Sequence, residues 1–187
     1  MNIKNNMKLI SIDLETLGLD TDKDSILQIG AVFDDLSNQL PLEQLPKFEI
    51  FIDEGHLHGN AYAFNMHVKS GLWQRWNEAK KVSLDEAIEE FISFTILAYT
   101  GRDPKNHLRI WSQSLPGGLA SILSGEKINL AGKNIGKFDF HCLRRSKKFL
   151  DFVNNYCSHR FIDPADHFIW WETDKVKPDL RECKKRA

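Results

Sequence analysis

The sequence predicts an α/β fold in which a mixed sheet begins as an antiparallel meander, continues with parallel strands and is flanked by helices. Three strand-like stretches lie close together near the start of the chain, and polar or Pro-bearing connectors separate them. Helical periodicity then takes over, and a later strand-like stretch leads directly into a helical one. Early strands followed by an alternation of helix and strand are typical of a layered α/β domain.

The early strands are identified by their apolar patterning. They are expected at 7–16, at 26–35 (ILQIGAVFDD) and at 47–54 (KFEIFIDE). The connectors DTDKDS and NQLPLEQLP have the composition of loops between neighbouring strands. We therefore expect the three strands to form a meander.

Helical patterns follow at 61–76 (AYAFNMHVKSGLWQRW) and after Ser83, where S-L-D-E is a capping box. Further along, INLAGKN (128–134) is interpreted as a strand and KFDFHCLRRSKKFLDFV (137–153) as a helix. Between these regions, 101–127 is rich in Gly, Pro and Asn, which predicts an irregular insertion with one short strand or helix.

The length of the chain favours a single domain, and its charge distribution is compatible with a charged binding partner. With 187 residues, of which 42% are hydrophobic, the chain can bury one core, so we expect a single domain over 1–187. The net charge of -1 hides an asymmetry: residues 1–130 hold 12 basic and 18 acidic residues, and 131–187 hold 13 and 8. An acidic site beside a basic track suits a polyanion held through metal, although solvated charge runs give the same counts.

Several other classes of protein are disfavoured. Three cysteines without CxxC spacing indicate neither a disulfide framework nor a zinc cluster, and they fit a reducing, cytoplasmic location. No apolar stretch has the length of a signal peptide or a membrane span, so we expect no membrane segment. The sequence contains neither GxxxxGK[ST] nor GxGxxG, which disfavours the common nucleotide-binding loops. Oligomeric state is left open.

The stretch SIDLETLGLD (11–20) places two carboxylates, Asp13 and Glu15, at alternate positions of the first strand. Alternate residues of a strand share a face, so their Cα atoms are roughly 6 to 7 Å apart and their charges repel. A half-buried strand with one solvated face would explain this alternation. A hard divalent cation between the two acids would explain it as well, and it would also explain why two poor strand formers stand there.

Asp139 is a candidate third acid. It follows the strand expected at 128–134 and lies near the start of the next helix, and α/β sheets gather their functional sites at such strand ends. Alone, Asp139 is equally explained as an acid that the helix dipole favours. Together with Asp13 and Glu15 it becomes a candidate metal ligand.

These residues resemble two motifs of the DEDDh family of 3′-to-5′ exonucleases, which have a ribonuclease H-like fold. The first motif, DxExTG in form, reads D-L-E-T-x-G here, and the second is an Asn followed by an aromatic residue and Asp, with a spacing similar to that of oligoribonucleases. The stretches SHRFIDP (158–164) and KPDLRECKKRA (177–187) look like the strand and helix that precede the third motif. The matching residues are Asp13, Glu15, Thr16, Gly18, Asn134, Phe138 and Asp139.

The third family motif, a His with an Asp five positions later, is absent. Each of the seven His residues is followed at that distance by another residue, and only His167 has an acid there, Glu172. We expect the chain to stop just before the C-terminal helix that carries this His-x4-Asp motif. His159 and Asp163 could form a displaced catalytic pair or, as a structural interpretation, a pair that orders a loop.

The resemblance implies a metal-dependent hydrolase that cleaves phosphodiester bonds at the 3′ end of single-stranded DNA or RNA. Two Mg²⁺ or Mn²⁺ ions about 3.5 to 4 Å apart would be held by Asp13, Glu15 and Asp139. A catalytically inactive module that binds nucleic acid or protein on the same scaffold is the alternative. The resemblance also implies a group of substrate contacts, namely Thr16, Leu17, Gly18, Asn134 and Phe138.

Overall fold

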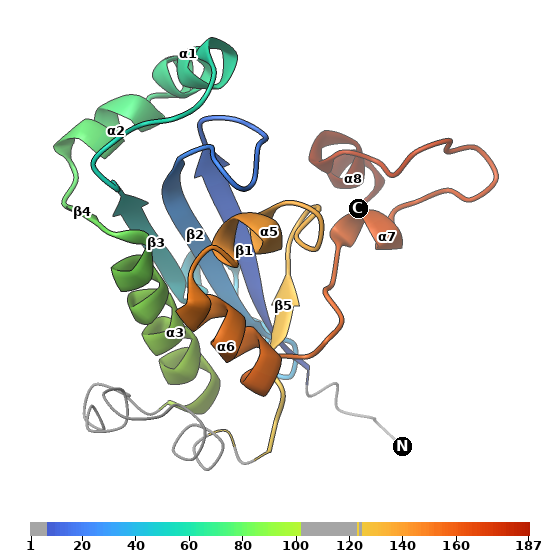
Figure 1. Ribbon diagram of the computed structural model, residues 1–187. Helices are drawn as coiled ribbons and strands as arrows, with labels where there is room; N and C mark the ends of the chain where they lie inside the picture. Colours follow the sequence, from blue (N-terminus) through green and yellow to red (C-terminus); the bar gives the residue numbers. More distant parts are fainter. Residues whose placement is uncertain (1–6, 102–122, 124) are drawn as a thin grey trace, which may run out of the picture.

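A computed structural model describes residues 7–101, 123 and 125–187 of the chain. Five strands form one mixed sheet in the order β4-β3-β2-β1-β5, with helices packed against it (Figure 1). Most of the insertion predicted at 101–127 lies outside the described residues. No helix in the described part of the chain is both long enough and apolar enough to cross a bilayer.

The first three strands pair as the predicted antiparallel meander. β1 pairs with β2, and β2 with β3, in antiparallel fashion, whereas β5 joins β1 and β4 joins β3 in parallel. The strands are β1 (Lys8–Thr16), β2 (Ile26–Asp35), β3 (Lys47–Ile52), β4 (Lys81–Val82) and β5 (Asn129–Ala131). The predicted mixed α/β sheet, with an antiparallel meander and parallel pairing of the later strands, is confirmed.

Helices occupy the predicted regions, but two of them are divided. The helix predicted at 61–76 is two helices that meet at Gly71, and the helix predicted at 137–153 is interrupted at 144–146. The helical elements are η1 (Leu42–Gln44), α1 (Ala61–Ser70), α2 (Leu72–Glu78), α3 (Leu84–Thr100), α5 (Asp139–Leu143), α6 (Lys147–Tyr156), α7 (Pro164–His167) and α8 (Leu180–Arg186).

Tertiary contacts explain the second interruption. Buried Ser146 donates a hydrogen bond from Oγ to Asp85 on α3 at 2.6 Å. Arg145 donates to the backbone oxygen of Asp24 at 2.7 Å and to Glu54 at 3.1 Å. A continuous helix would carry these side chains to other faces, so the turn between α5 and α6 is set by partners far away in the sequence.

The main core lies between the sheet and the pair of helices α3 and α6, which cover one face of it (Figure 1). The capping box predicted at Ser83 is present: the Ser83 side chain accepts from the Glu86 N–H, and the Glu86 carboxylate accepts from the Ser83 N–H. Three fully buried aromatic side chains, from α3 and α6, centre this core: Phe91, Phe149 and Phe152.

The C-terminal region differs from the sequence-based expectation in one respect. The stretch 158–164, predicted as a strand, contributes only an isolated parallel bridge, between Ile162 and Ala131. The helix predicted within 177–187 is present as α8. Trp170 and Trp171 are exposed by 57% and 81%, so neither of them belongs to the core.

Candidate carboxylate site

The end of β1 exposes acidic residues because its two faces differ. Ile12 and Leu14 point into the main core, whereas Asp13 points to the opposite face, where it borders a hollow of about 490 Å³. Glu15 is half-buried one pleat further along. The strand therefore presents its two carboxylates on one face, as the alternation predicted.

β5 is short, and this leaves one edge of β1 available. The parallel ladder runs only as far as Ser11 opposite Ala131. At the next residue, Gly132, the chain passes so close to β1 that a Cβ would lie 2.6 Å from the Ile12 backbone oxygen. Only glycine fits this approach, after which the chain turns away towards α5.

Asp139 is positioned at this free edge. It is the first residue of α5, it is 4% exposed, and its Oδ1 accepts a hydrogen bond from the Leu14 N–H at 3.2 Å. Since Leu14 lies between Asp13 and Glu15, this bond brings a carboxylate from 125 residues away against the acidic end of β1.

Burial makes all three carboxylates harder to ionise, and the charge of Asp13 adds to this for the other two. Burial, with a further contribution from the charge of Asp13, raises the pKa of Asp139 to about 7. Burial also raises the pKa of Asp13. The pKa of Glu15 is raised by burial and by Asp13, while His67 and Arg75 oppose the change. The three acids thus place negative charge at one strand end, where ionising each of them is costly.

The chemistry of these donors fits a hard divalent cation, but their present arrangement does not form a coordination shell. Carboxylate oxygens are the ligands that Mg²⁺ and Mn²⁺ prefer, and a cation would offset the mutual repulsion. Among the described residues, however, no three His, Cys, Asp or Glu side chains are placed so that they could hold a metal ion.

A small cavity adjoins the acids and is lined largely by apolar side chains. Its volume is about 230 Å³, and its walls include Glu15, Thr16, Gly18 and Phe138 together with Tyr62 from α1. The structure therefore brings together three of the residues predicted to contact substrate: Thr16 at the end of β1, Gly18 in the turn after it, and Phe138 just before α5.

The other two predicted contacts lie elsewhere. Leu17 is 4% exposed and packs in a second, smaller core with Leu72 and Trp76, so it is a buried turn residue. Asn134 lines a separate cavity of about 220 Å³, where its N–H donates to Asp163 at 3.2 Å. Asp163 thus orders this loop, as its structural interpretation proposed.

His67 is a member of the site that the sequence did not indicate. It lies on α1, is 2% exposed, and lines the cavity beside Glu15. Its Nε2 is 2.8 Å from the Thr16 backbone oxygen, and its Nδ1 is 3.6 Å from Glu15 Oε2. His67 is not followed by an Asp five positions later, and no short spacing links it to Thr16 and Glu15, which lie about 50 positions earlier.

The turn after β1 is held by close packing. A Cβ on Gly18 would lie 1.9 Å from Asp24 Oδ2, so the turn needs glycine there for space. Asp24 in turn accepts from the Asp20 N–H at 2.9 Å and is 2.9 Å from His58 Nδ1. These contacts fix the backbone that forms one wall of the cavity.

Comparison with known proteins supports the resemblance. No family model matches the chain. An oligoribonuclease from Xanthomonas campestris pv. campestris is 40% identical over 75 residues, which is 40% of this chain and 38% of that protein. An oligoribonuclease from Xylella fastidiosa is 39% identical over 74 residues, which is 39% of this chain and 38% of that protein. The match therefore spans less than half the length of these curated relatives.

Solved structures of exonuclease I are also similar, at low sequence identity. A product-bound exonuclease I superposes with a TM-score of 0.49 and 13% identity, over 95% of this chain and 36% of that one. The similarity to oligoribonucleases, together with the mixed sheet, confirms the resemblance of this chain to the DEDDh-type 3′-to-5′ exonucleases.

Proposed function

We propose that this chain forms the nuclease domain of a metal-dependent 3′-to-5′ exonuclease, which hydrolyses phosphodiester bonds at the 3′ end of single-stranded nucleic acid. The observation that carries the proposal is the contact between Asp139 and the Leu14 N–H, which gathers three carboxylates of raised pKa at one strand end. The similarity to oligoribonucleases supports the same activity.

In this proposal Asp13, Glu15 and Asp139 bind divalent cations, Mg²⁺ or Mn²⁺. When bound, such ions supply an activated water and stabilise the charge on the leaving oxygen. The bond from the Leu14 N–H uses only Oδ1 of Asp139, so its Oδ2 remains available as a ligand. His67 keeps Glu15 and the backbone of Thr16 in place through its two ring nitrogens.

The cavity beside Glu15 is the proposed site of the terminal nucleotide. Its apolar walls and the ring of Phe138 suit a base or sugar, while the backbone at Thr16 and Gly18 lies next to the acids that act on the phosphate. Leu17 does not face this cavity; its burial in the smaller core anchors the turn that forms one wall. Asn134 shapes the loop that leads from β5 to α5.

The sequence contains no candidate general base at the position that the His-x4-Asp motif of the family would give it. No His in the chain has an Asp five positions later. Loss of a general base typically costs about 10²- to 10⁴-fold in rate. We therefore expect the 187-residue chain to degrade single strands slowly even when divalent cations are bound.

The test compares Asp13→Asn with a control, Asp34→Asn, which changes an acid at the far end of β2. Mn²⁺ binding is measured by calorimetry, and degradation of labelled single strands, DNA beside RNA, is followed with and without Mn²⁺. Asp13→Asn should abolish both binding and turnover while leaving the melting temperature equal or higher, since like-charge repulsion is removed. Unchanged Mn²⁺ binding in Asp13→Asn would rule out the proposed role of the carboxylates.

The missing His-x4-Asp motif also favours a second candidate, a binding module without turnover. That function predicts single-strand or protein binding that is equally strong in the presence of a chelator, with no cleavage even after long incubation in Mn²⁺. The same assay therefore separates the two candidates.

A further inference from the structure

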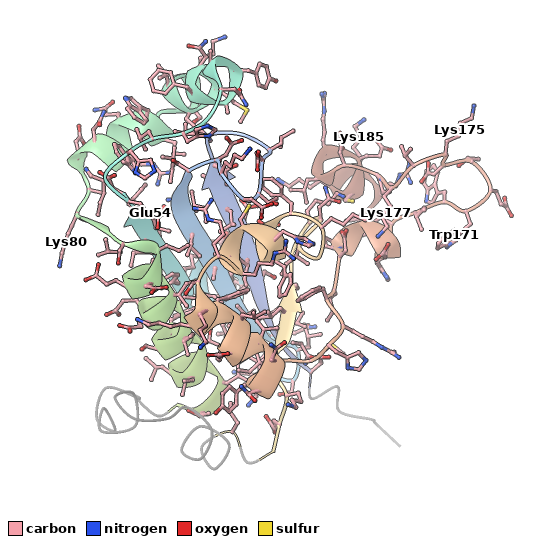
Figure 2. All side chains as sticks on the ribbon, viewed as in Figure 1. Glu54, Lys80, Trp171, Lys175, Lys177 and Lys185 are labelled. Carbon is pink, nitrogen blue, oxygen red and sulfur yellow. The ribbon has the colours of Figure 1, made fainter. Side chains whose placement is uncertain are left out.

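The last twenty residues form an arm, 168–187, that projects beyond the sheet and presents large apolar side chains to solvent (Figure 2). Trp171 is 81% exposed, Val176 is 78% exposed and Trp170 is 57% exposed. Indole rings carry a large apolar surface, and two adjacent exposed ones indicate a contact surface.

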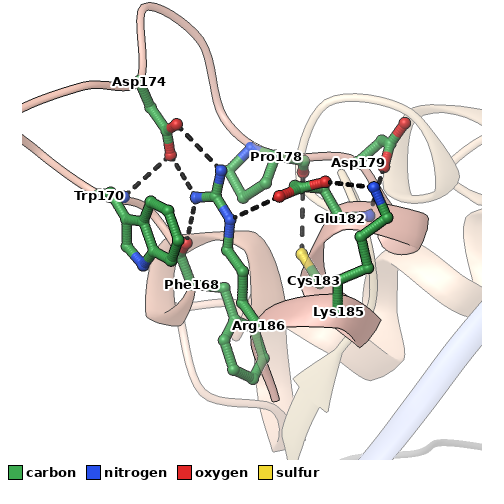
Figure 3. A network of polar contacts seen from close by, with 9 residues as sticks. All are labelled: Phe168, Trp170, Asp174, Pro178, Asp179, Glu182, Cys183, Lys185 and Arg186. Carbon is green, nitrogen blue, oxygen red and sulfur yellow. Dashed lines mark hydrogen bonds and ion pairs between the residues drawn. The ribbon is translucent and has the colours of Figure 1, made fainter.

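The arm holds Trp170 in a fixed orientation (Figure 3). The guanidinium carbon of Arg186 lies 4.1 Å from the centre of the Trp170 ring, in a cation–π contact. Arg186 is itself held by Asp174, with nitrogen–oxygen distances of 2.5 and 3.0 Å, and by the Phe168 backbone oxygen at 2.8 Å. One side of the ring is therefore covered, while more than half of the residue's surface stays open to solvent.

The loop that carries the two rings is closed by its own hydrogen bonds. The Trp170 N–H donates to Asp174 Oδ2 at 2.9 Å, and the Asp174 N–H donates back to the Trp170 oxygen at 2.9 Å. A surface that is ordered before binding loses less conformational entropy when a ligand arrives. The arm thus presents aromatic rings that need little rearrangement.

The segment that carries these rings has a small excess of positive charge. Lys175 and Lys184 are exposed and have no ion-pair partner among the described residues. Lys177 pairs with Asp163 and Asp166, and it borders the cavity that Asn134 lines. The segment 170–187 as a whole carries six basic residues, two more than its four acidic ones, Glu172, Asp174, Asp179 and Glu182.

We propose that Trp170 and Trp171 are a stacking platform for bases of a single-stranded nucleic acid, with Lys175 facing its phosphates. This rests on the proposed function, because it takes the strand to be the one whose 3′ end reaches the carboxylates. Lys177, which belongs to the same arm, borders the cavity that Asn134 lines on the loop leading to Asp139.

Two features favour a nucleic acid over a second copy of the chain as the occupant. Aromatic rings beside cationic side chains match the alternation of bases and phosphates along a single strand, and each stacked base contributes about 1–3 kcal/mol. A two-fold contact through this loop would instead bring the unpaired Lys175 side chains of both copies together, and like charges disfavour such an approach.

The test measures binding in EDTA, so that it requires neither metal nor turnover. Trp171→Ala, Trp171→Phe and a control, Leu42→Ala, which removes an exposed apolar side chain from η1, are titrated against fluorescein-labelled oligonucleotides of 2 and 12 nucleotides. Trp171→Ala should weaken binding of the 12-mer by about 5- to 100-fold and leave the dinucleotide unaffected. Trp171→Phe should restore most of the affinity, and the control should behave as the parent.

A second variant, Lys175→Glu, tests the charge without touching a ring. It should weaken 12-mer binding and reduce the slope of log K against log salt by about 0.7 or more, since at least one phosphate contact is lost. The platform is overturned if both variants bind the 12-mer like the parent. It is overturned as well if Trp171→Ala converts a dimer into a monomer in sedimentation without changing oligonucleotide affinity. Failure of the proposed hydrolysis, by contrast, would appear only when Mn²⁺ is added.

Discussion

The core beneath α3 and α6 and the C-terminal arm are stabilised by different forces. In the core, Phe91, Phe149 and Phe152 are 0 to 1% exposed and their rings contact one another directly. From 164 onwards the buried residues are Ala165, Pro178 and Cys183, and the arm depends instead on the ion pairs of Arg186.

This difference indicates that the core determines the global stability of the protein, whereas changes in the arm should affect that stability little. Apolar burial stabilises by about 25 cal/mol per Å² and is insensitive to salt, whereas partly exposed ion pairs contribute less and are screened. The carboxylates stand at the end of the well-packed core, while the proposed stacking platform stands on the arm. Mutations that displace the acids should therefore differ from mutations that weaken binding of the nucleic-acid strand.

The largest effect on stability is expected from truncation in the core. Phe91→Ala removes a fully buried ring that contacts Phe48, Phe149 and Phe152, and it should lower the free energy of unfolding by about 3–5 kcal/mol. Urea denaturation followed by far-UV circular dichroism measures this. A loss below about 1 kcal/mol would show that the core is not the stabilising part.

The next effect depends on pH and concerns the metal-free protein. Because the pKa of Asp139 is raised from 3.8 to about 7, the folded state holds a proton that the unfolded state releases. Its contribution should therefore make the free energy of unfolding fall as pH rises between about 4 and 7, by on the order of 1.4 kcal/mol per pH unit. Asp139→Asn should remove this component of the slope. Equal slopes for parent and variant, measured by denaturation in EDTA, would contradict the assignment.

A smaller effect is expected at the start of α3. Ser83→Ala removes the side chain that accepts from the Glu86 N–H at 3.3 Å, which should cost about 1 kcal/mol of stability. Ser83→Asp, which can still cap the helix, should keep most of it. Thermal melts of both variants decide the matter, and identical losses would indicate that capping is unimportant here.

The smallest global effect is expected from the arm. Arg186→Ala removes the ion pairs to Asp174 and Glu182 and the cation that covers Trp170, yet it leaves the main core intact. We expect an unchanged urea midpoint together with faster amide hydrogen exchange at 168–187. Loss of global stability comparable with that of Phe91→Ala would erase the contrast between the two regions.

Local patterning predicted much of the fold. The first three strands and α3 were identified from alternating residues and a capping box, because these signals are contained within a few neighbouring positions. The break between α5 and α6 could not be found in this way, since nothing in LRRSKK is a helix breaker. It depends on the contacts of Arg145 with Asp24 and of Ser146 with Asp85, which exist only once the chain has folded.

The candidate site was predictable to a similar degree. Asp13 and Glu15 follow from the strand alternation, and Asp139 from its place after a later strand, whereas His67 has no sequence signal and enters because α1 folds over the turn after β1. The side chain of Leu17 could face either a ligand or a core as far as its own turn is concerned. Packing against α2 decides this, and that contact cannot be predicted from the local sequence.

Gly132 lies very close to the Ile12 oxygen, and the path of the backbone at this point determines where Asp139 lies. A methyl group at 132 would touch neither the acid nor the helix that carries it. It would nevertheless push the start of the loop away from β1, and the loop would carry Asp139 with it, out of reach of the Leu14 N–H. The acidic cluster can therefore be dismantled from seven residues away, by a substitution that leaves every charged group in the protein unchanged.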